Sequence, residues 1–201
     1  YGWGNVFGIL LVPLAIVFVV YLVLAKDAPE CPPPKRLVEY LAVLKDKDAW
    51  WFMFFYAVTF GGFVGLASSL TIYFNTQYGL DAKTAGFFTA ACVFAGYLVR
   101  PIGGGVADRI GGIRSLTVMY ALAALFLGIV SIGLPQAWMA LSVFVLAMLA
   151  LGMGNGAVFQ LVPQRFRKEI GVMTGLVGMA GGVGGFWLAS SLGYSRQITG
   201  S

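Results

Sequence analysis

Six apolar stretches, each about as long as a bilayer is thick, constrain this chain more than any other feature. They cover approximately residues 4–25, 49–74, 84–107, 115–134, 138–162 and 171–193. About 20 apolar residues cross the hydrocarbon core as a helix, and a helix satisfies its own backbone hydrogen bonds, as lipid requires. Only 10% of the residues are charged, against roughly 25% in soluble domains. We therefore predict an all-α integral membrane protein with six transmembrane helices.

The polar residues between the spans predict how the chain is organised. Residues 1–25 form one span, residues 26–48 a solvated connector, and residues 49–201 a bundle of five spans. The connector holds five basic and five acidic residues together with several prolines, and a short surface helix is expected around Arg36–Lys45. The chain has no initiator Met, and apolar runs lie close to both of its ends. We expect it to be a fragment of a longer protein.

The basic residues predict the orientation in the membrane. Loops 26–48, 108–114 and 165–169 hold ten of the thirteen Lys and Arg residues, whereas the alternate loops hold only Lys83. Cytoplasmic loops carry the excess of Lys and Arg, so these three loops are expected in the cytoplasm, with the chain in the inner (plasma) membrane. This asymmetry explains the net charge of +5, and no nucleic-acid partner is expected.

Arg100 is the one charged residue of an otherwise apolar span. A guanidinium stays cationic, and at membrane depth it normally faces a bundle interior or a water-filled cavity. Its partner there is either an anion that the protein binds or a carboxylate elsewhere in the protein. We favour the anion, and we interpret Arg100 as the counter-charge in a transporter for a small anion.

Other polar and aromatic residues, and one glycine, are predicted to lie at the same membrane depth as Arg100. With a rise of 1.5 Å per residue, Arg100 and Tyr56 each lie roughly 12 Å from the cytoplasmic ends of their helices. Asn155 and Gly178 lie at a similar depth, and Phe159 shares the Asn155 face one turn away. Taken singly, the aromatic residues fit packing and Asn155 fits a hydrogen bond between helices. Together they favour a binding site near the bilayer centre.

Glycines mark faces where helices are expected to approach one another closely. Along the last span they recur at Gly171, Gly175, Gly178, Gly182 and Gly185, with a second face formed by Gly181 and Gly184. The run Gly152-x-Gly154-x-Gly156 is not interpreted as a nucleotide site, because no strand precedes it. The chain has no His, and its two cysteines, Cys31 and Cys92, are not expected to pair. Neither a metal, nor a cofactor, nor an enzyme active site is expected.

The segment from Gly103 to Arg114 resembles the loop motif of the major facilitator superfamily, G-x-x-x-D-R-x-G-R-R in outline. The matching positions are Gly104, Asp108, Arg109, Gly112 and Arg114. The resemblance implies a conformational latch, in which Asp108 meets a helix N-terminus and the arginines bind neighbouring carbonyls or carboxylates.

Flanking segments are similar to the nitrate/nitrite porter family of that superfamily. They are Val99-Arg-Pro-Ile-Gly-Gly, Gly152-Met-Gly-Asn-Gly-Ala-Val-Phe-Gln and the glycine-rich run from Gly175 to Phe186, with Tyr56 to Phe63 fitting the seventh helix. The resemblance implies that the spans are helices six to eleven of twelve, and that the missing N-terminal half is the partner of this one. It assigns the binding of nitrate or nitrite to Arg100, Tyr56, Asn155, Phe159, Gly178 and Gly182.

No Asp, Glu, His or Lys lies within the apolar spans, and proton symport normally needs a group that titrates at membrane depth. We therefore predict nitrate/nitrite antiport by alternating access. The alternatives are proton-coupled nitrate uptake with a carboxylate in the missing half, a carrier for another small anion, and a sensor or structural half-domain that does not transport.

Overall fold

The computed structural model describes residues 2–26, 38 and 42–199, and the chain divides into two compact units, Tyr1–Arg36 and Leu37–Ser201. The first unit contains α1 (Trp3–Leu24), which is apolar on all sides and has no polar face. Pro13 lies inside this helix, a position tolerated within membrane spans. The prolines of the connector, Cys31 and half of the predicted surface helix at 36–45 (residues 36, 37 and 39–41) lie outside the described residues.

The second unit consists of helices alone wherever the structure describes it. They are η1 (Ala42–Lys45), α3 (Lys47–Tyr78), α4 (Ala82–Leu98), α5 (Arg100–Ile110), α6 (Gly112–Ser131), α7 (Ala137–Arg165) and α8 (Ile170–Thr199). Within the described residues, six helical segments are long and apolar enough to cross a membrane, with α4 and α5 counted together as one. The predicted all-α membrane fold with six spans is confirmed.

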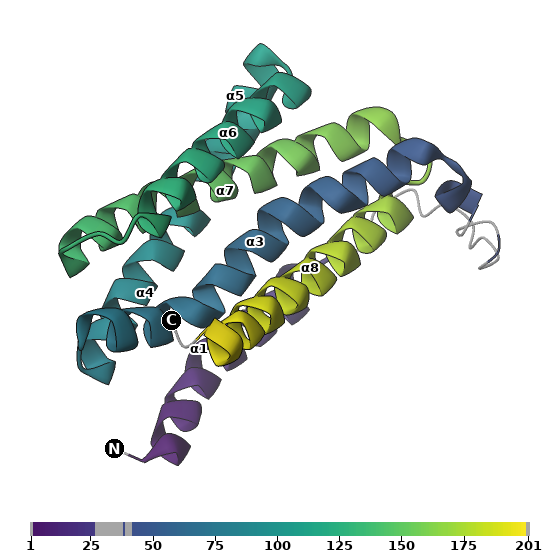
Figure 1. Ribbon diagram of the computed structural model, residues 1–201. Coiled ribbons are helices and arrows are strands. Elements are labelled where there is room, and N and C mark those ends of the chain that lie inside the picture. Colours follow the sequence, from purple (N-terminus) through teal and green to yellow (C-terminus); the bar gives the residue numbers. More distant parts are fainter. Residues whose placement is uncertain (1, 27–37, 39–41, 200–201) are drawn as a thin grey trace. The chain divides into compact units, whose positions relative to one another are not determined.

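Helix α7 lies at the centre of the second unit, and α3 lies between α7 and α8 (Figure 1). Helices α3, α4, α5 and α6 all pack against α7, while α8 packs mainly along α3. The buried residues form two clusters. One surrounds Val158, Val162 and Met173, and the other surrounds Phe63, Phe74 and Phe144.

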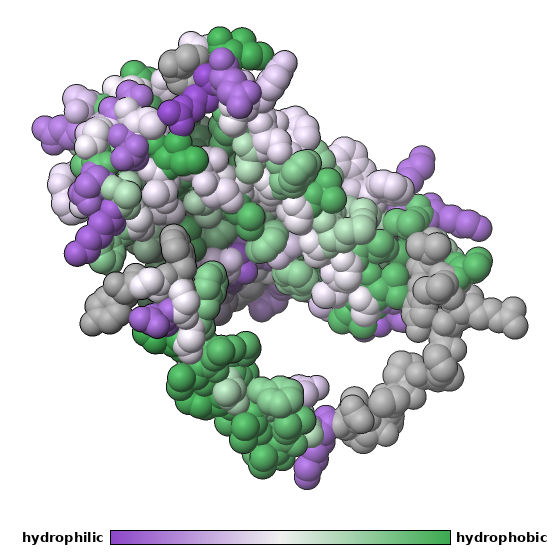
Figure 2. Space-filling model, turned by 90° about the horizontal axis from the view of Figure 1, so that it is seen from below, coloured by the Kyte–Doolittle hydropathy of each residue, from purple (hydrophilic) through white to green (hydrophobic). Residues whose placement is uncertain are grey.

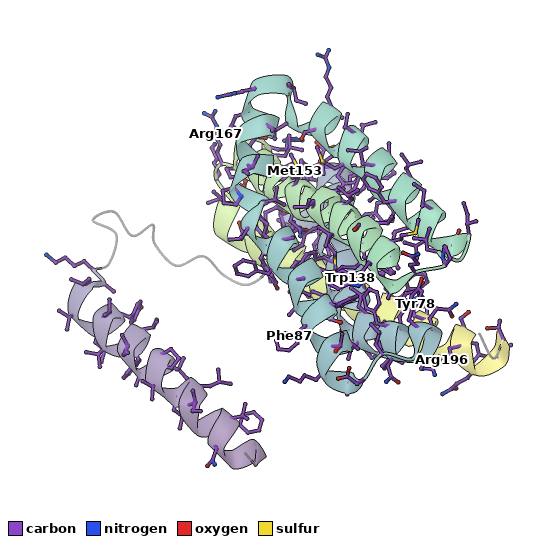
Figure 3. All side chains as sticks on the ribbon, turned by 90° about the vertical axis from the view of Figure 1, so that its left-hand side faces the viewer. Tyr78, Phe87, Trp138, Met153, Arg167 and Arg196 are labelled. Carbon is purple, nitrogen blue, oxygen red and sulfur yellow. The ribbon has the colours of Figure 1, made fainter. Side chains whose placement is uncertain are left out.

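The two ends of this unit differ in chemistry, as the charge pattern predicts. Arg167 lies at one end, and Tyr78 and Trp138 lie toward the other, where Arg196 also lies (Figure 3). Between the ends, hydrophobic and neutral residues cover much of the face shown in Figure 2. The Tyr78 hydroxyl donates to the carbonyl of Leu134 at 2.9 Å, which joins the end of α3 to the connection before α7. Tyr and Trp in such positions are typical of a membrane interface.

One connection at the basic end is shorter than the sequence predicts. The expected loop 108–114 is almost entirely helical, and only Gly111, with φ +93°, separates α5 from α6. A glycine adopts this conformation without the penalty that a Cβ would impose. Charged residues mark where a helix leaves the membrane, but they do not end the helix.

The predicted third span, 84–107, is broken into two helices at Val99. Pro101 explains the break, since proline has no backbone N–H and its ring crowds the preceding turn. Arg100 therefore lies at the start of α5 rather than in the middle of one straight helix.

Candidate functional site

Aromatic rings, and no carboxylate, surround the Arg100 guanidinium among the described residues. Its Cζ atom lies 4.1 Å from the centroid of the Tyr97 ring and 5.3 Å from those of Phe60 and Phe63. Its Nε and Nη2 atoms are buried and have no hydrogen-bond partner within the described part of the chain. A ring face attracts a cation through its quadrupole but leaves the N–H donors of the cation unused. Arg100 is therefore free to bind an anion.

The predicted aromatic residues lie in one group with Arg100, and Phe60 connects them. The Tyr56 ring stacks on Phe60 with centroids 5.1 Å apart and planes 4° apart. Phe159 meets Tyr56 edge to face, at 4.8 Å and 77°. Tyr56 is 5% exposed, whereas Phe159 is 37% exposed and presents part of its ring outside the core. Helices α3, α5 and α7 thus bring Tyr56, Phe159 and Arg100 to one depth.

Asn155 lies on α7 one turn before Phe159 and is almost fully buried, with 1% of its surface exposed. Neither its Nδ2 nor its Oδ1 atom has a hydrogen-bond partner among the described residues. An unsatisfied buried amide costs about 1–3 kcal/mol per group. The simpler interpretation of Asn155 requires a hydrogen bond from its side chain to another helix. The described structure contains no such bond. The polar atoms of Asn155 are therefore available to an anion, and its role in anion binding stays a prediction.

The glycines of α8 divide into two faces, but not as the sequence predicts. A Cβ at Gly171, Gly175, Gly178 or Gly182 would meet no atom of the described structure within 4 Å. Close packing instead occurs at Gly181, Gly184 and Gly185, where a Cβ would meet Tyr56, Ala57 and Val64 of α3. No described helix meets Gly171, Gly175, Gly178 or Gly182, so close approach of a helix at these four positions stays a prediction, while Gly185 belongs to the face that packs on α3.

Gly178 and Gly182 consequently have no contact with the aromatic group, and their predicted role in substrate binding stays a prediction. Gly181 is the α8 residue that lies against Tyr56: a Cβ there would come within 2.6 Å of the Tyr56 ring. Sequence reasoning placed Gly181 on a second glycine face and missed its part in the site, because Gly178 and Gly181 are only three positions apart and lie on adjacent faces of the helix. The spacing of glycines along one helix does not show which helix each face meets.

A hydrogen bond from Gln160 connects the loop motif to the candidate site, although the sequence predicted no role for Gln160. Gln160 donates from Nε2 to Oδ1 of Asp108 at 2.8 Å, and it directly follows Phe159 on α7. Asp108 lies on the same short helix as Arg100, two turns further along. The expected partner of Asp108, a helix N-terminus, is replaced here by the Gln160 amide. Arg109 and Arg114 are exposed and form no ion pair within the described residues.

Other polar groups in the unit serve structure. Ser68 and Ser69 donate to the carbonyls of Val64 and Gly65, four residues earlier, which agrees with leaving them out of the site. Outside the spans, hydrogen bonds from the Thr84 side chain and backbone lower the pKa of Asp81, which caps the start of α4. Cys92 is buried and forms no disulfide among the described residues, as expected for an apolar filler.

Comparison with known proteins places the chain in a family. The family model of the Major Facilitator Superfamily matches residues 1–189. The probable nitrate/nitrite transporter NarK2 of Mycobacterium tuberculosis is 33% identical over 190 residues, which are 93% of this chain and 48% of that protein. The nitrite extrusion protein of Bacillus subtilis is 30% identical over 200 residues, 99% of this chain and 50% of its own length.

A third relative, the probable nitrate transporter NarT of Staphylococcus carnosus, is 33% identical over 205 residues, which cover 100% of this chain and 51% of that protein. The chain thus spans about half the length of the relatives it matches. These findings confirm the predicted resemblance to nitrate/nitrite porters, and they agree with a multi-pass membrane protein that is not an enzyme.

Proposed function

Because this chain belongs to the major facilitator superfamily, we propose that it is part of a transporter that carries nitrate and nitrite across the membrane by alternating access. The observation that carries the proposal is the unpaired Arg100, whose buried Nε and Nη2 atoms have no partner in the described structure. The printed names of the relatives support nitrate and nitrite as substrates. The guanidinium binds two oxygens of such an anion at once, and the Phe159 ring offers a face to a flat ion.

Exchange of nitrate for nitrite is the mode of transport that the residues support best. No Asp, Glu, His or Lys lies in the apolar stretches of the sequence, so this part of the transporter has no group that would carry a proton. A bound anion neutralises Arg100 and lowers the cost of closing the site around it. An empty cationic site resists closing, so each conformational change is expected to carry an anion.

Arg100→Lys in the full-length protein tests this function. The protein is reconstituted into liposomes filled with nitrite, with labelled nitrate outside and no pH gradient. Uptake is expected to require internal nitrite. It is expected to fall roughly ten- to hundredfold in Arg100→Lys, because lysine cannot form the bidentate hydrogen bond, which is worth about 1.5–3 kcal/mol. Arg167→Lys is the matched control, because Arg167 is exposed at the basic end of the unit, away from the site.

Two outcomes contradict the proposal. Nitrate uptake into empty vesicles, driven by an imposed proton gradient, rules out obligatory exchange and points to a titrating group elsewhere in the protein. Wild-type transport by Arg100→Lys rules out Arg100 as the binding charge.

A further inference from the structure

The Arg100 guanidinium needs a support that does not compete with its substrate. A carboxylate beside it would hold the charge in place but would also occupy its N–H donors, and an incoming anion would then have to displace it. The face of an aromatic ring attracts the cation without occupying those donors. Among the three rings around Arg100, Tyr97 lies closest, at 4.1 Å from Cζ.

One side of the Tyr97 ring packs on the core, although 45% of the residue is exposed. Its ring meets Phe63 edge to face, with centroids 5.0 Å apart and planes 76° apart. Phe63 is fully buried and lies so close to Gly96 that a Cβ there would collide with its ring. Glycine at position 96 therefore makes room for Phe63, and Phe63 in turn supports Tyr97. This order of contacts leads from the core of the bundle to the guanidinium.

Helical spacing places Tyr97 beside Arg100, because side chains three positions apart lie on the same side of a helix. The two residues are three positions apart, on either side of Val99, where α4 ends and α5 begins. The Tyr97 hydroxyl forms no hydrogen bond within the described residues. The ring, rather than the hydroxyl, is therefore the part of Tyr97 that acts on Arg100.

We propose that Tyr97 is a positioning residue for anion binding, whose ring holds the Arg100 guanidinium in place while leaving its N–H groups free for the substrate. The proposal rests on the proposed function, since it names a second residue that this site requires. The Tyr97 ring acts through Arg100 and is not assigned a contact with the anion.

The test compares Tyr97→Phe, which keeps the ring, with Tyr97→Leu, which removes it. In the full-length protein in nitrite-filled liposomes, Tyr97→Leu is expected to raise the KM for nitrate about three- to tenfold, between the values for an exposed and a desolvated cation–π contact, because the ring is partly exposed. A much smaller change in kcat is expected. Tyr97→Phe is expected to stay within about twofold of wild type for both constants, because it keeps the cation–π contact.

Phe94→Leu is the matched control, because Phe94 lies one turn earlier on α4, is 65% exposed and stacks on no ring of the described residues. It is expected to transport like wild type. Thermal unfolding in detergent checks that each variant is folded.

The outcomes separate this inference from the proposed function. If Tyr97→Leu keeps the wild-type KM while Arg100→Lys loses transport, the positioning role is overturned and the function stands. Equal losses in Tyr97→Phe and Tyr97→Leu also overturn the role, because the hydroxyl would then be essential. If Arg100→Lys transports nitrate like the wild type, Arg100 is not the binding charge and the positioning role of Tyr97 falls with it. If the wild-type protein transports neither nitrate nor nitrite, the proposed function itself fails.

Discussion

At the scale of single residues, the site combines polar groups that are costly to bury. Arg100 and Asn155 both carry buried polar atoms without hydrogen-bond partners among the described residues. Native proteins contain few such atoms, and those that occur call for an explanation. The proposed anion-binding site explains both residues, since a guanidinium and an amide N–H each donate hydrogen bonds to oxygen. Under this proposal, the two groups reduce the stability of the protein and provide the hydrogen bonds that hold the anion.

Asn155→Leu is expected to separate binding from stability. The leucine has a similar volume and no polar atoms, so the protein without nitrate is expected to become more stable, by about 1–2 kcal/mol, as an unsatisfied buried amide is removed. Nitrate transport is expected to fall at the same time. Thermal unfolding with and without nitrate, together with liposome uptake, measures both effects. A large loss of stability without nitrate would instead show that Asn155 connects helices.

At the scale of elements, the pairing of α5 with α7 holds two parts of the site together. Gly103 of α5 lies directly against the backbone of Met153, and Gly156 of α7 lies against the backbone of Arg100. The hydrogen bond from Gln160 to Asp108 joins the same two helices further along. Arg100 and Phe159 therefore lie on two helices that are in direct backbone contact at glycines. A small separation of α5 from α7 would change the distance between Arg100 and Phe159.

Gly103→Ala tests this packing. The added methyl group would meet the Met153 backbone, which has no side-chain rotamer with which to yield, so a loss of about 1–3 kcal/mol is expected from overpacking. Gly105→Ala, on the same helix, faces open space and is expected to be neutral or slightly stabilising, because alanine favours the helix. Chemical or thermal unfolding of the two variants side by side decides the matter. Similar stabilities would contradict the close approach of α5 and α7.

At the scale of the whole molecule, charge sets the expected orientation. Arg165, at the end of α7, forms ion pairs with Asp46 at 2.9 Å and Asp48 at 2.6 Å, at the start of α3. These exposed pairs each contribute little to stability, typically less than about 1 kcal/mol. They join two helix ends at the basic end of the unit, which the positive-inside rule assigns to the cytoplasm.

Cysteine labelling tests this orientation. Gln136→Cys and Lys168→Cys are introduced separately into a full-length protein whose other cysteines are replaced, and intact cells are treated with a maleimide that does not cross membranes. Gln136→Cys, in the exposed connection before α7, is expected to react in intact cells. Lys168→Cys is expected to react only after permeabilisation. The reverse pattern would show that the protein has the opposite orientation.

The sequence alone determined the number of spans, their approximate ends and the asymmetry of charge, because hydrophobicity and charge act on each segment whatever its neighbours are. It also singled out Arg100, Tyr56, Asn155 and Phe159, since polar and aromatic residues at matching depths can be counted along a helix.

Only the tertiary structure decided which helix faces meet. It showed that Gly181, and not Gly178, lies against Tyr56, that Phe60 and Tyr97 pack around Arg100, and that Gln160 binds Asp108. The physical reason is that these contacts depend on how each helix is rotated about its axis and on which helices become neighbours. Both are set by packing between segments that lie far apart in the sequence.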